Sequence, residues 1–131
     1  MRNDPDLLLG VLGVAVIAAK GEGDYAAVVR LLNKMLKEET DLSGRLLCLR
    51  VRAEAKFELE DYSGCIADYS ECLKDRPDQA PVVMLRMRAY RRSGMTAEAL
   101  EDCAHLLRLA DISENRKAIK EYRRLIEAGG Q

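Results

Sequence analysis

Apolar residues recur along the chain at intervals of three and four, with polar residues between them. This spacing is typical of an α-helix with one buried face. It appears at corresponding places in three segments, residues 23–40, 60–77 and 94–111. The recurring positions are Val28, Leu32, Met35; Cys65, Tyr69, Cys72; and Ala99, Cys103, Leu106. The pattern therefore predicts three helices that each bury one face.

A second apolar-periodic segment lies upstream of each of these helices, at about residues 5–20, 44–59 and 79–92, and ends in a glycine or acidic turn. Tyr25 and Tyr62 are 37 residues apart, and Thr96 follows 34 residues later. A fixed period of this size indicates repeated helical hairpins. We predict three repeats, at about residues 5–41, 44–78 and 79–111, and a seventh helix at about 112–128 whose polar face caps the end.

Short polar residues stand where several helices are predicted to begin. Asp24, Asp61 and Thr96 precede the second helices of the three repeats, and Asp78 precedes the helix with Pro81 in its first turn. Such side chains accept hydrogen bonds from the free amides of a first turn. We expect them to be N-caps.

The spacing within residues 61–78 resembles the tetratricopeptide repeat, because a small residue, an aromatic and a proline stand at Cys65, Tyr69 and Pro77. The resemblance implies one all-α domain over residues 1–131, a right-handed superhelix of three antiparallel helix-turn-helix repeats with a capping helix. In that family the first helices of the pairs line a concave groove. The positions that would line it here are Val14, Ile17, Leu47, Arg50, Val51, Glu54, Phe57, Met84, Leu85, Arg88 and Arg91.

Composition limits the classes of partner. A third of the residues are charged, yet the formal net charge is only -1. Residues 1–75 hold 10 basic and 14 acidic residues, and residues 76–131 hold 11 and 8. Neither balance is extreme, so bulk charge gives no reason to expect nucleic acid or an anionic membrane as partner. A basic series on the last helix, including Lys117 and Lys120, keeps RNA binding as an alternative.

The four cysteines lie within apolar periodic segments, which indicates reduced core residues of a cytoplasmic protein. The chain has no CxxC pair and one histidine, His105, so we expect no metal and no cofactor. His105 lies two residues after Cys103, on another side of the same predicted helix, and we interpret it as a surface residue. With no phosphate loop and no nucleophile elbow, the sequence predicts a protein that is not an enzyme.

Residues 7–19 form an uninterrupted apolar segment that is too short to span a bilayer as a helix. It has the length of a signal-peptide core, but Asp4 and Asp6 precede it where a signal peptide carries positive charge. Pro5 and Asp6 instead suit a helix start, so a buried helix is the preferred interpretation.

The best-known use of the resembled family is a carboxylate clamp for the acidic tails of chaperones. The clamp positions would fall at Gly13, Ile17, Val51, Pro81 and Leu85, and none of these side chains can donate a hydrogen bond. The sequence therefore argues against this partner.

The predicted groove combines apolar residues with a basic wall of Arg88, Arg91 and Arg92. Such a surface suits a peptide or amphipathic helix with apolar anchors and acidic flanks. We predict a protein-interaction module: an adaptor, a co-chaperone or the recruiting domain of a larger protein. Val14 and Ile17 could equally face a neighbouring domain or a second copy in a homodimer, in a domain with no groove ligand. The partner, the oligomeric state and whether the chain is part of a larger protein stay open.

Overall fold

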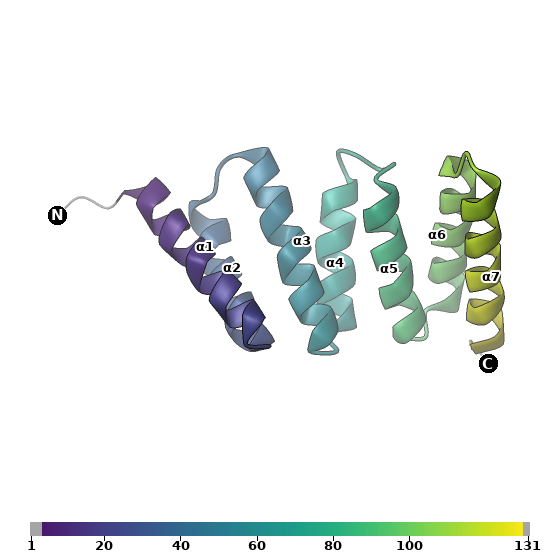
Figure 1. Ribbon diagram of the computed structural model, residues 1–131, viewed down its shortest axis with the longest axis horizontal. Helices are drawn as coiled ribbons and strands as arrows, with labels where there is room; N and C mark the ends of the chain where they lie inside the picture. Colours follow the sequence, from purple (N-terminus) through teal and green to yellow (C-terminus); the bar gives the residue numbers. More distant parts are fainter. Residues whose placement is uncertain (1–3, 130–131) are drawn as a thin grey trace. The chain divides into compact units, whose positions relative to one another are not determined.

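The computed structural model describes residues 4–129, and every regular element among them is an α-helix (Figure 1). The prediction of an all-α fold is confirmed. The helices are α1 (Pro5–Gly21), α2 (Tyr25–Glu38), α3 (Leu42–Glu58), α4 (Tyr62–Leu73), α5 (Ala80–Arg92), α6 (Thr96–Leu109) and α7 (Ser113–Gly129).

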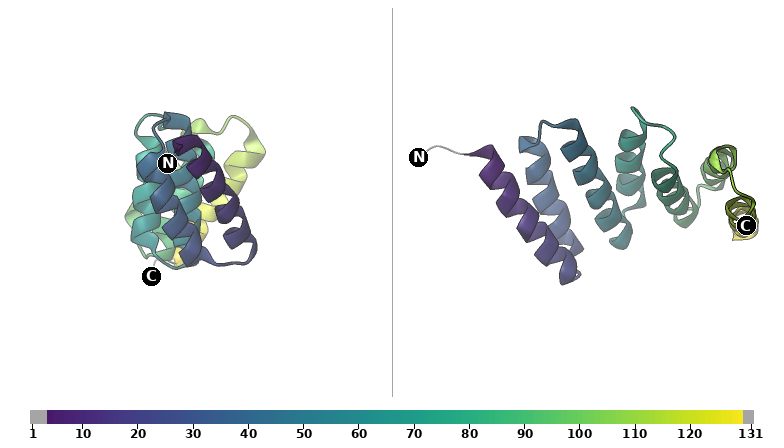
Figure 2. Two further views of the ribbon diagram at one scale, coloured as in Figure 1. Left: turned by 90° about the vertical axis from the view of Figure 1, so that its left-hand side faces the viewer. Right: turned by 45° about the horizontal axis from the view of Figure 1, so that its top comes forward.

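The chain forms two compact units. The first ends at Asp68 and the second begins at Tyr69, so the boundary between them falls within α4. In the first unit α1 packs against α2 and α2 against α3; in the second unit α5 packs against α6 and α6 against α7. Consecutive helices in each unit lie side by side, as the second view of Figure 2 also shows. The single domain and the right-handed superhelix stay predictions.

The turn between the two helices of each predicted repeat has the same backbone conformation. Gly23, Glu60 and Gly94 have positive φ angles of 72°, 62° and 79°. In each turn this residue's amide donates to the carbonyl three residues earlier, and the next amide donates to the carbonyl five residues earlier. This is the arrangement that satisfies the last carbonyls of a helix. The repeat is therefore present in the backbone, with Glu60 where the other turns have glycine.

The predicted N-caps are only partly correct. Asp24 and Asp61 accept hydrogen bonds from amides in the first turns of α2 and α4. Thr96 is wrong as a cap, because it is the first residue of α6 and follows Met95. Asp78 is wrong too: the N-cap of α5 is Gln79, whose side-chain amide donates to the Cys72 and Arg76 carbonyls at 2.9 Å each.

Eight of the nine positions that the helical periodicity marked are buried in the core, and the ninth, Met35, is half-buried against it. Cys65, Tyr69 and Ala99 are all buried, as are Cys48 and the other two cysteines, and all four thiols are free. Burial is the main cause that raises the pKa of the Cys48 and Cys103 thiols above the ordinary value of 9.0. All four cysteines are therefore free, buried core residues, as the sequence predicted.

The second and the third repeat each contain a buried arginine–aspartate pair that joins their two helices. Arg52 of α3 donates two hydrogen bonds to Asp68 of α4, at 2.7 and 2.9 Å, and a third to Asn33 of α2. Arg86 and Asp102, both 34 residues further on, form the same pair at 2.7 and 3.0 Å.

The third hydrogen bond of Arg86 goes to the Ser70 hydroxyl on α4, so each arginine also contacts the helix that precedes its own. Among the described residues no buried side-chain nitrogen or oxygen lacks a partner. The hydrogen bonds to Asp102 are the main cause that raises the pKa of Arg86, which therefore stays charged. Arg86 therefore belongs to the internal packing of this unit.

Candidate protein-interaction groove

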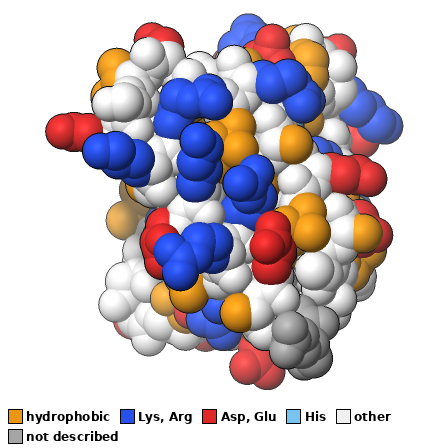
Figure 3. All heavy atoms as spheres, turned by 90° about the vertical axis from the view of Figure 1, so that its right-hand side faces the viewer, with side chains coloured by type: hydrophobic (Ala, Val, Ile, Leu, Met, Phe, Trp, Pro, Cys, Tyr) orange, Lys and Arg blue, Asp and Glu red, His pale blue; other side chains and the backbone are white. Residues whose placement is uncertain are grey.

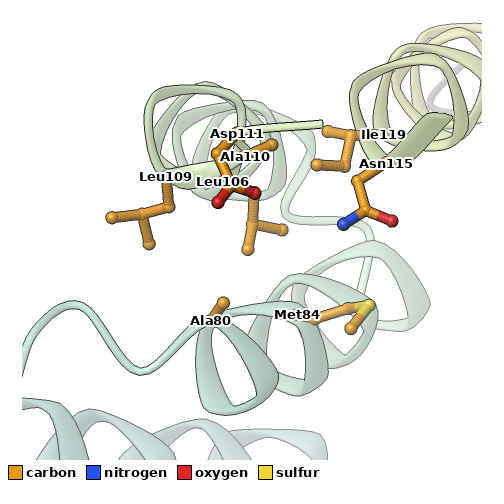
Figure 4. A pocket seen from close by; sticks show the side chains of 8 residues that line it. All are labelled: Ala80, Met84, Leu106, Leu109, Ala110, Asp111, Asn115 and Ile119. Atoms are coloured by element: carbon orange, nitrogen blue, oxygen red, sulfur yellow. The ribbon is translucent and has the colours of Figure 1, made fainter. Parts of the chain in front are cut away.

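Helices α5 and α7 of the second unit border an apolar groove whose floor is Leu106 of α6; we call it the α5–α7 groove. It holds two cavities, of about 360 and 340 Å³, which share Met84, Leu106 and Ile119. Figure 4 shows the first cavity, with Met84 on α5 and Ile119 on α7 either side of Leu106. The first is also lined by Ala80, Leu109, Ala110, Asp111 and Asn115, and the second by Leu85, Met87, Arg88, Ala118 and Tyr122.

The groove forms because α5 and α7 each bury only some of their apolar residues and leave others at the surface. Val83 and Met87 are buried, whereas Met84 lies on a neighbouring face of α5 and is 51% exposed. Helix α7 is anchored near its C-terminal end by the buried Ile126, whereas Ile119, two turns earlier, is only half-buried. The N-terminal half of α7 thus borders open space rather than filling it.

Charged and polar residues lie at different ends of the groove. Asp111 and Asn115 line one cavity, and Arg88 and Tyr122 line the other. The guanidinium carbon of Arg91 lies 5.3 Å from the centre of the Tyr122 ring, a cation–π contact. An apolar segment in this groove would therefore meet a carboxylate at one end and cationic groups at the other, which would favour one direction of binding.

The predicted groove residues of the second unit fall into this site. Met84, Leu85 and Arg88 line its second cavity, and Arg91 contacts one of its residues. Sequence reasoning missed the other wall, because α7 was interpreted as a cap and as an alternative RNA-binding surface. The signal was Ile119, Tyr122 and Ile126, which recur at three and four residues in an otherwise polar helix.

Predicted groove residues of the first unit do not form one site. Val51 and Glu54 line a cavity of about 220 Å³ with Lys20, whose Nζ lies 3.4 Å from Glu54 Oε2. Phe57 is half-buried, and its ring packs edge-on against Tyr62 at 5.3 Å between centroids. The other predicted groove residues of the first unit are exposed to solvent: Val14, Ile17, Leu47 and Arg50.

His105 and Cys103 have separate partners. His105 is half-buried, and its Nε2 lies 2.9 Å from Oδ1 of the exposed Asp78. Cys103 is fully buried, with its Sγ 3.0 Å from Met87 Sδ. Across residues 4–129 no group of three or more His, Cys, Asp or Glu side chains could hold a metal ion.

Basic residues on α7 are largely engaged within the protein. Arg116 donates to the Leu107 carbonyl, Arg124 lies 2.8 Å from Glu121, and Arg123 lies 3.9 Å from Glu127. The face seen in Figure 3 has many lysines and arginines, but acidic and hydrophobic side chains lie between them. It is not a continuous basic surface of the kind that tracks a phosphate backbone.

A protein-family model described as "Bacterial transcriptional activator domain" matches residues 26–113. This span contains α2 to α6, including the α5 wall and the floor of the α5–α7 groove. The match supports a helical repeat similar to the tetratricopeptide repeat, under a different family name. The comparison with curated proteins found no match. None of the helices at residues 4–129 has the length and apolarity that crossing a bilayer requires.

Proposed function

Because the chain belongs to the family of bacterial transcriptional activator domains, we propose that it is the protein-interaction module of a bacterial transcriptional activator. It holds a segment of another protein in the α5–α7 groove and has no catalytic step of its own. A transcriptional role implies the bacterial cytoplasm, and it is favoured over a co-chaperone role because the clamp positions are apolar.

The observation that carries the proposal is the pair of apolar cavities on either side of Met84 and Ile119. They suit a peptide or amphipathic helix with two apolar anchors about one helical turn apart. Burying two such side chains contributes about 3–6 kcal/mol before the ordering costs of association. We expect affinities in the micromolar range or weaker.

The charges at the groove ends specify the partner further. Arg88 at one end would attract an acidic residue that flanks the anchors. Asp111 at the other end would attract a basic residue or the N-terminus of a bound helix. An exposed ion pair of this kind is worth about 0.2–1 kcal/mol. Its main effect is therefore on orientation rather than on affinity.

Direct contact with nucleic acid is the alternative function. The exposed Lys117 and Lys120 would favour it, but the arginines of α7 already have acidic or carbonyl partners. A protein that relies on phosphate contacts loses affinity steeply with salt, whereas an apolar groove does not. Measuring the binding of the chain to duplex DNA and to single-stranded RNA at several salt concentrations separates the two functions.

Recruitment can be tested in bacteria by fusing the chain to an unrelated DNA-binding domain whose operator lies upstream of a weak promoter. The wild-type fusion should activate a reporter gene, and Met84→Glu should return expression to the level of the DNA-binding domain alone. The matched control is Leu59→Glu, since Leu59 is 47% exposed and lies in the first unit. Equal activation by wild type and Met84→Glu, or salt-sensitive nucleic-acid binding by the chain alone, would contradict the proposal.

A further inference from the structure

A separate cavity lies in the first unit, where the end of α1 and the start of α2 meet α3; we call it the Tyr25 cavity. Its volume is about 220 Å³, and Lys20 of α1 and Tyr25 of α2 border it. Its α3 wall consists of residues spaced three and four apart, which therefore share one face of that helix: Val51, Glu54, Ala55 and Glu58.

The floor of the Tyr25 cavity is apolar and its rim is charged. Val28 and Ala55 are 1% and 2% exposed, so they close the cavity on the side of the core. Glu54 and Glu58 are exposed and lie one helical turn apart on α3. Nζ of Lys20 lies 3.4 Å from Oε2 of Glu54. The rim therefore has two carboxylates and one ammonium group.

Comparison with the next repeat explains why this space is open. Tyr62 follows Tyr25 by 37 residues, and by the same interval Phe57 follows Lys20. In the second repeat the Phe57 ring packs edge-on against Tyr62, with 5.3 Å between the two centroids. In the first repeat a lysine with 52% of its side chain exposed stands at that position. The Tyr25 ring therefore borders a cavity at the place where Tyr62 has an aromatic neighbour.

The charges of the wall are also particular to this cavity. Glu54 and Glu58 belong to the first helix of the second repeat, and 34 residues later the third repeat has Arg88 and Arg92. The repeat pattern by itself therefore does not require acidic residues at these two positions. A rim with two carboxylates attracts a cation and repels an anion.

We propose that the Tyr25 cavity binds an arginine side chain of another polypeptide. Arginine combines a long apolar stem with a planar charged head, so the stem would lie on Val28 and Ala55 while the head reaches the rim. A guanidinium can donate hydrogen bonds to two carboxylates and can stack on an aromatic ring. Glu54, Glu58 and Tyr25 supply these groups.

Size and desolvation favour this occupant over others. A volume of about 220 Å³ corresponds to roughly seven molecules of liquid water, which is room for one long side chain and not for a helix. An uncharged side chain would cover two carboxylates without giving them a counter-charge. The exposed pair of Lys20 and Glu54 contributes little, so Lys20 can give way to the ligand. This inference is independent of the function proposed for the α5–α7 groove, because the whole cavity lies in the first unit.

Titration of the isotope-labelled chain with a capped peptide, acetyl-Ala-Arg-Ala-amide, followed by NMR, tests the proposal. We expect saturable shifts of the Tyr25, Ala55 and Glu58 amides and a dissociation constant in the millimolar range, because one side chain buries little surface. The matched peptide has citrulline, which keeps the shape of arginine but carries no charge. It should bind at least ~5-fold more weakly, since it loses the attraction of both carboxylates.

Two substitutions of Lys20 should act in opposite directions. Lys20→Ala removes a competing cation and should strengthen binding about 2- to 5-fold, the effect of an exposed ion pair. Lys20→Phe places a ring where the second repeat has Phe57, and it should fill the cavity and abolish binding. The matched control for charge is Lys34→Ala, at an exposed position of α2, which should leave binding unchanged. Should Lys20→Phe fail to fold, Val51→Phe takes its place.

The absence of saturable shifts would overturn the proposal, and so would equal affinity for the arginine and citrulline peptides. Stronger binding in both Lys20→Ala and Lys20→Phe would show a general effect of charge outside the cavity, which also contradicts it. Tighter binding of L-arginine than of the capped peptide would show a site for a small molecule instead. A peptide with lysine in place of arginine should bind more weakly, and equal or tighter binding would contradict the role of the guanidinium group.

Discussion

The buried pair of Arg86 and Asp102 gives the sharpest test of how the hairpins are held together. Asp102→Leu removes a carboxylate that is 4% exposed and accepts two hydrogen bonds from Arg86. The guanidinium would then lie in the hairpin beside the Ser70 hydroxyl and the Tyr90 ring, with the Glu101 carboxylate as a remaining nearby charge. Breaking a buried ion pair from one side costs about 3–5 kcal/mol.

The arginine side chain keeps 20% of its surface exposed, so water reaches part of the charge. We therefore place the loss at the lower end, about 3 kcal/mol, or a hundredfold or more in the unfolding equilibrium. The double substitution Arg86→Met, Asp102→Leu leaves no buried charge and should lie within about 1 kcal/mol of the wild type. The first hairpin supports this expectation. It has Ala15 and the partly buried core residue Leu31, each 37 residues before a member of the Arg52–Asp68 pair.

Urea unfolding followed by circular dichroism measures the four proteins of the cycle: wild type, the two single variants and the double variant. A conservative control is Arg108→Ala, which changes an exposed residue of α6 and should cost less than about 0.5 kcal/mol. If Asp102→Leu costs under 1 kcal/mol, or the double variant is as unstable as that single variant, the account of the pair as a mutually dependent buried charge is wrong.

Three further predictions concern stability. Glu60→Gly should stabilise the fold by about 1 kcal/mol, because Glu60 has a φ of 62°; a melting temperature no higher than that of the wild type would contradict it. Gln79→Ala should cost about 1–2 kcal/mol in urea unfolding by removing the two hydrogen bonds from its side-chain amide to the Cys72 and Arg76 carbonyls, and a cost under about 0.5 kcal/mol would show that these hydrogen bonds do not stabilise the fold. Burial raises the pKa of Cys48 and Cys103, so the unfolded chain releases protons first. The free energy of unfolding should fall as pH rises above 9.0, and a Cys48→Ala, Cys103→Ala variant should fall less.

Much of the local structure could be predicted from the sequence because it depends on neighbours in the chain. The apolar spacing located the helices, with the start of α3 at Leu42 instead of 44 and that of α5 at Ala80 instead of 79. Cap residues were less certain. Asp78 and Thr96 are suitable cap residues, but the chain places Gln79 and Met95 at those positions. Which residue of several begins a helix depends on how the preceding loop packs.

The candidate site was only half predictable. Met84, Leu85 and Arg88 followed from the resemblance to a helical repeat, since first helices of the pairs line a groove in that family. The opposite wall comes from α7, where Ile119 borders both cavities. No local pattern shows how far a helix will stand from its neighbour, because that distance depends on which side chains fill the space between them.

The sequence by itself determined the helical periods, the 34-residue repeat and the apolar character of α1, since these depend on residue type and spacing. Only the tertiary structure decided the partners. Arg52 and Asp68 are 16 residues apart, as are Arg86 and Asp102. Each pair meets because a turn that contains one residue of positive φ folds the second helix back along the first. Side chains that appear solvated in the sequence are then enclosed, and an enclosed charge is stable only when its counter-charge lies within hydrogen-bonding distance.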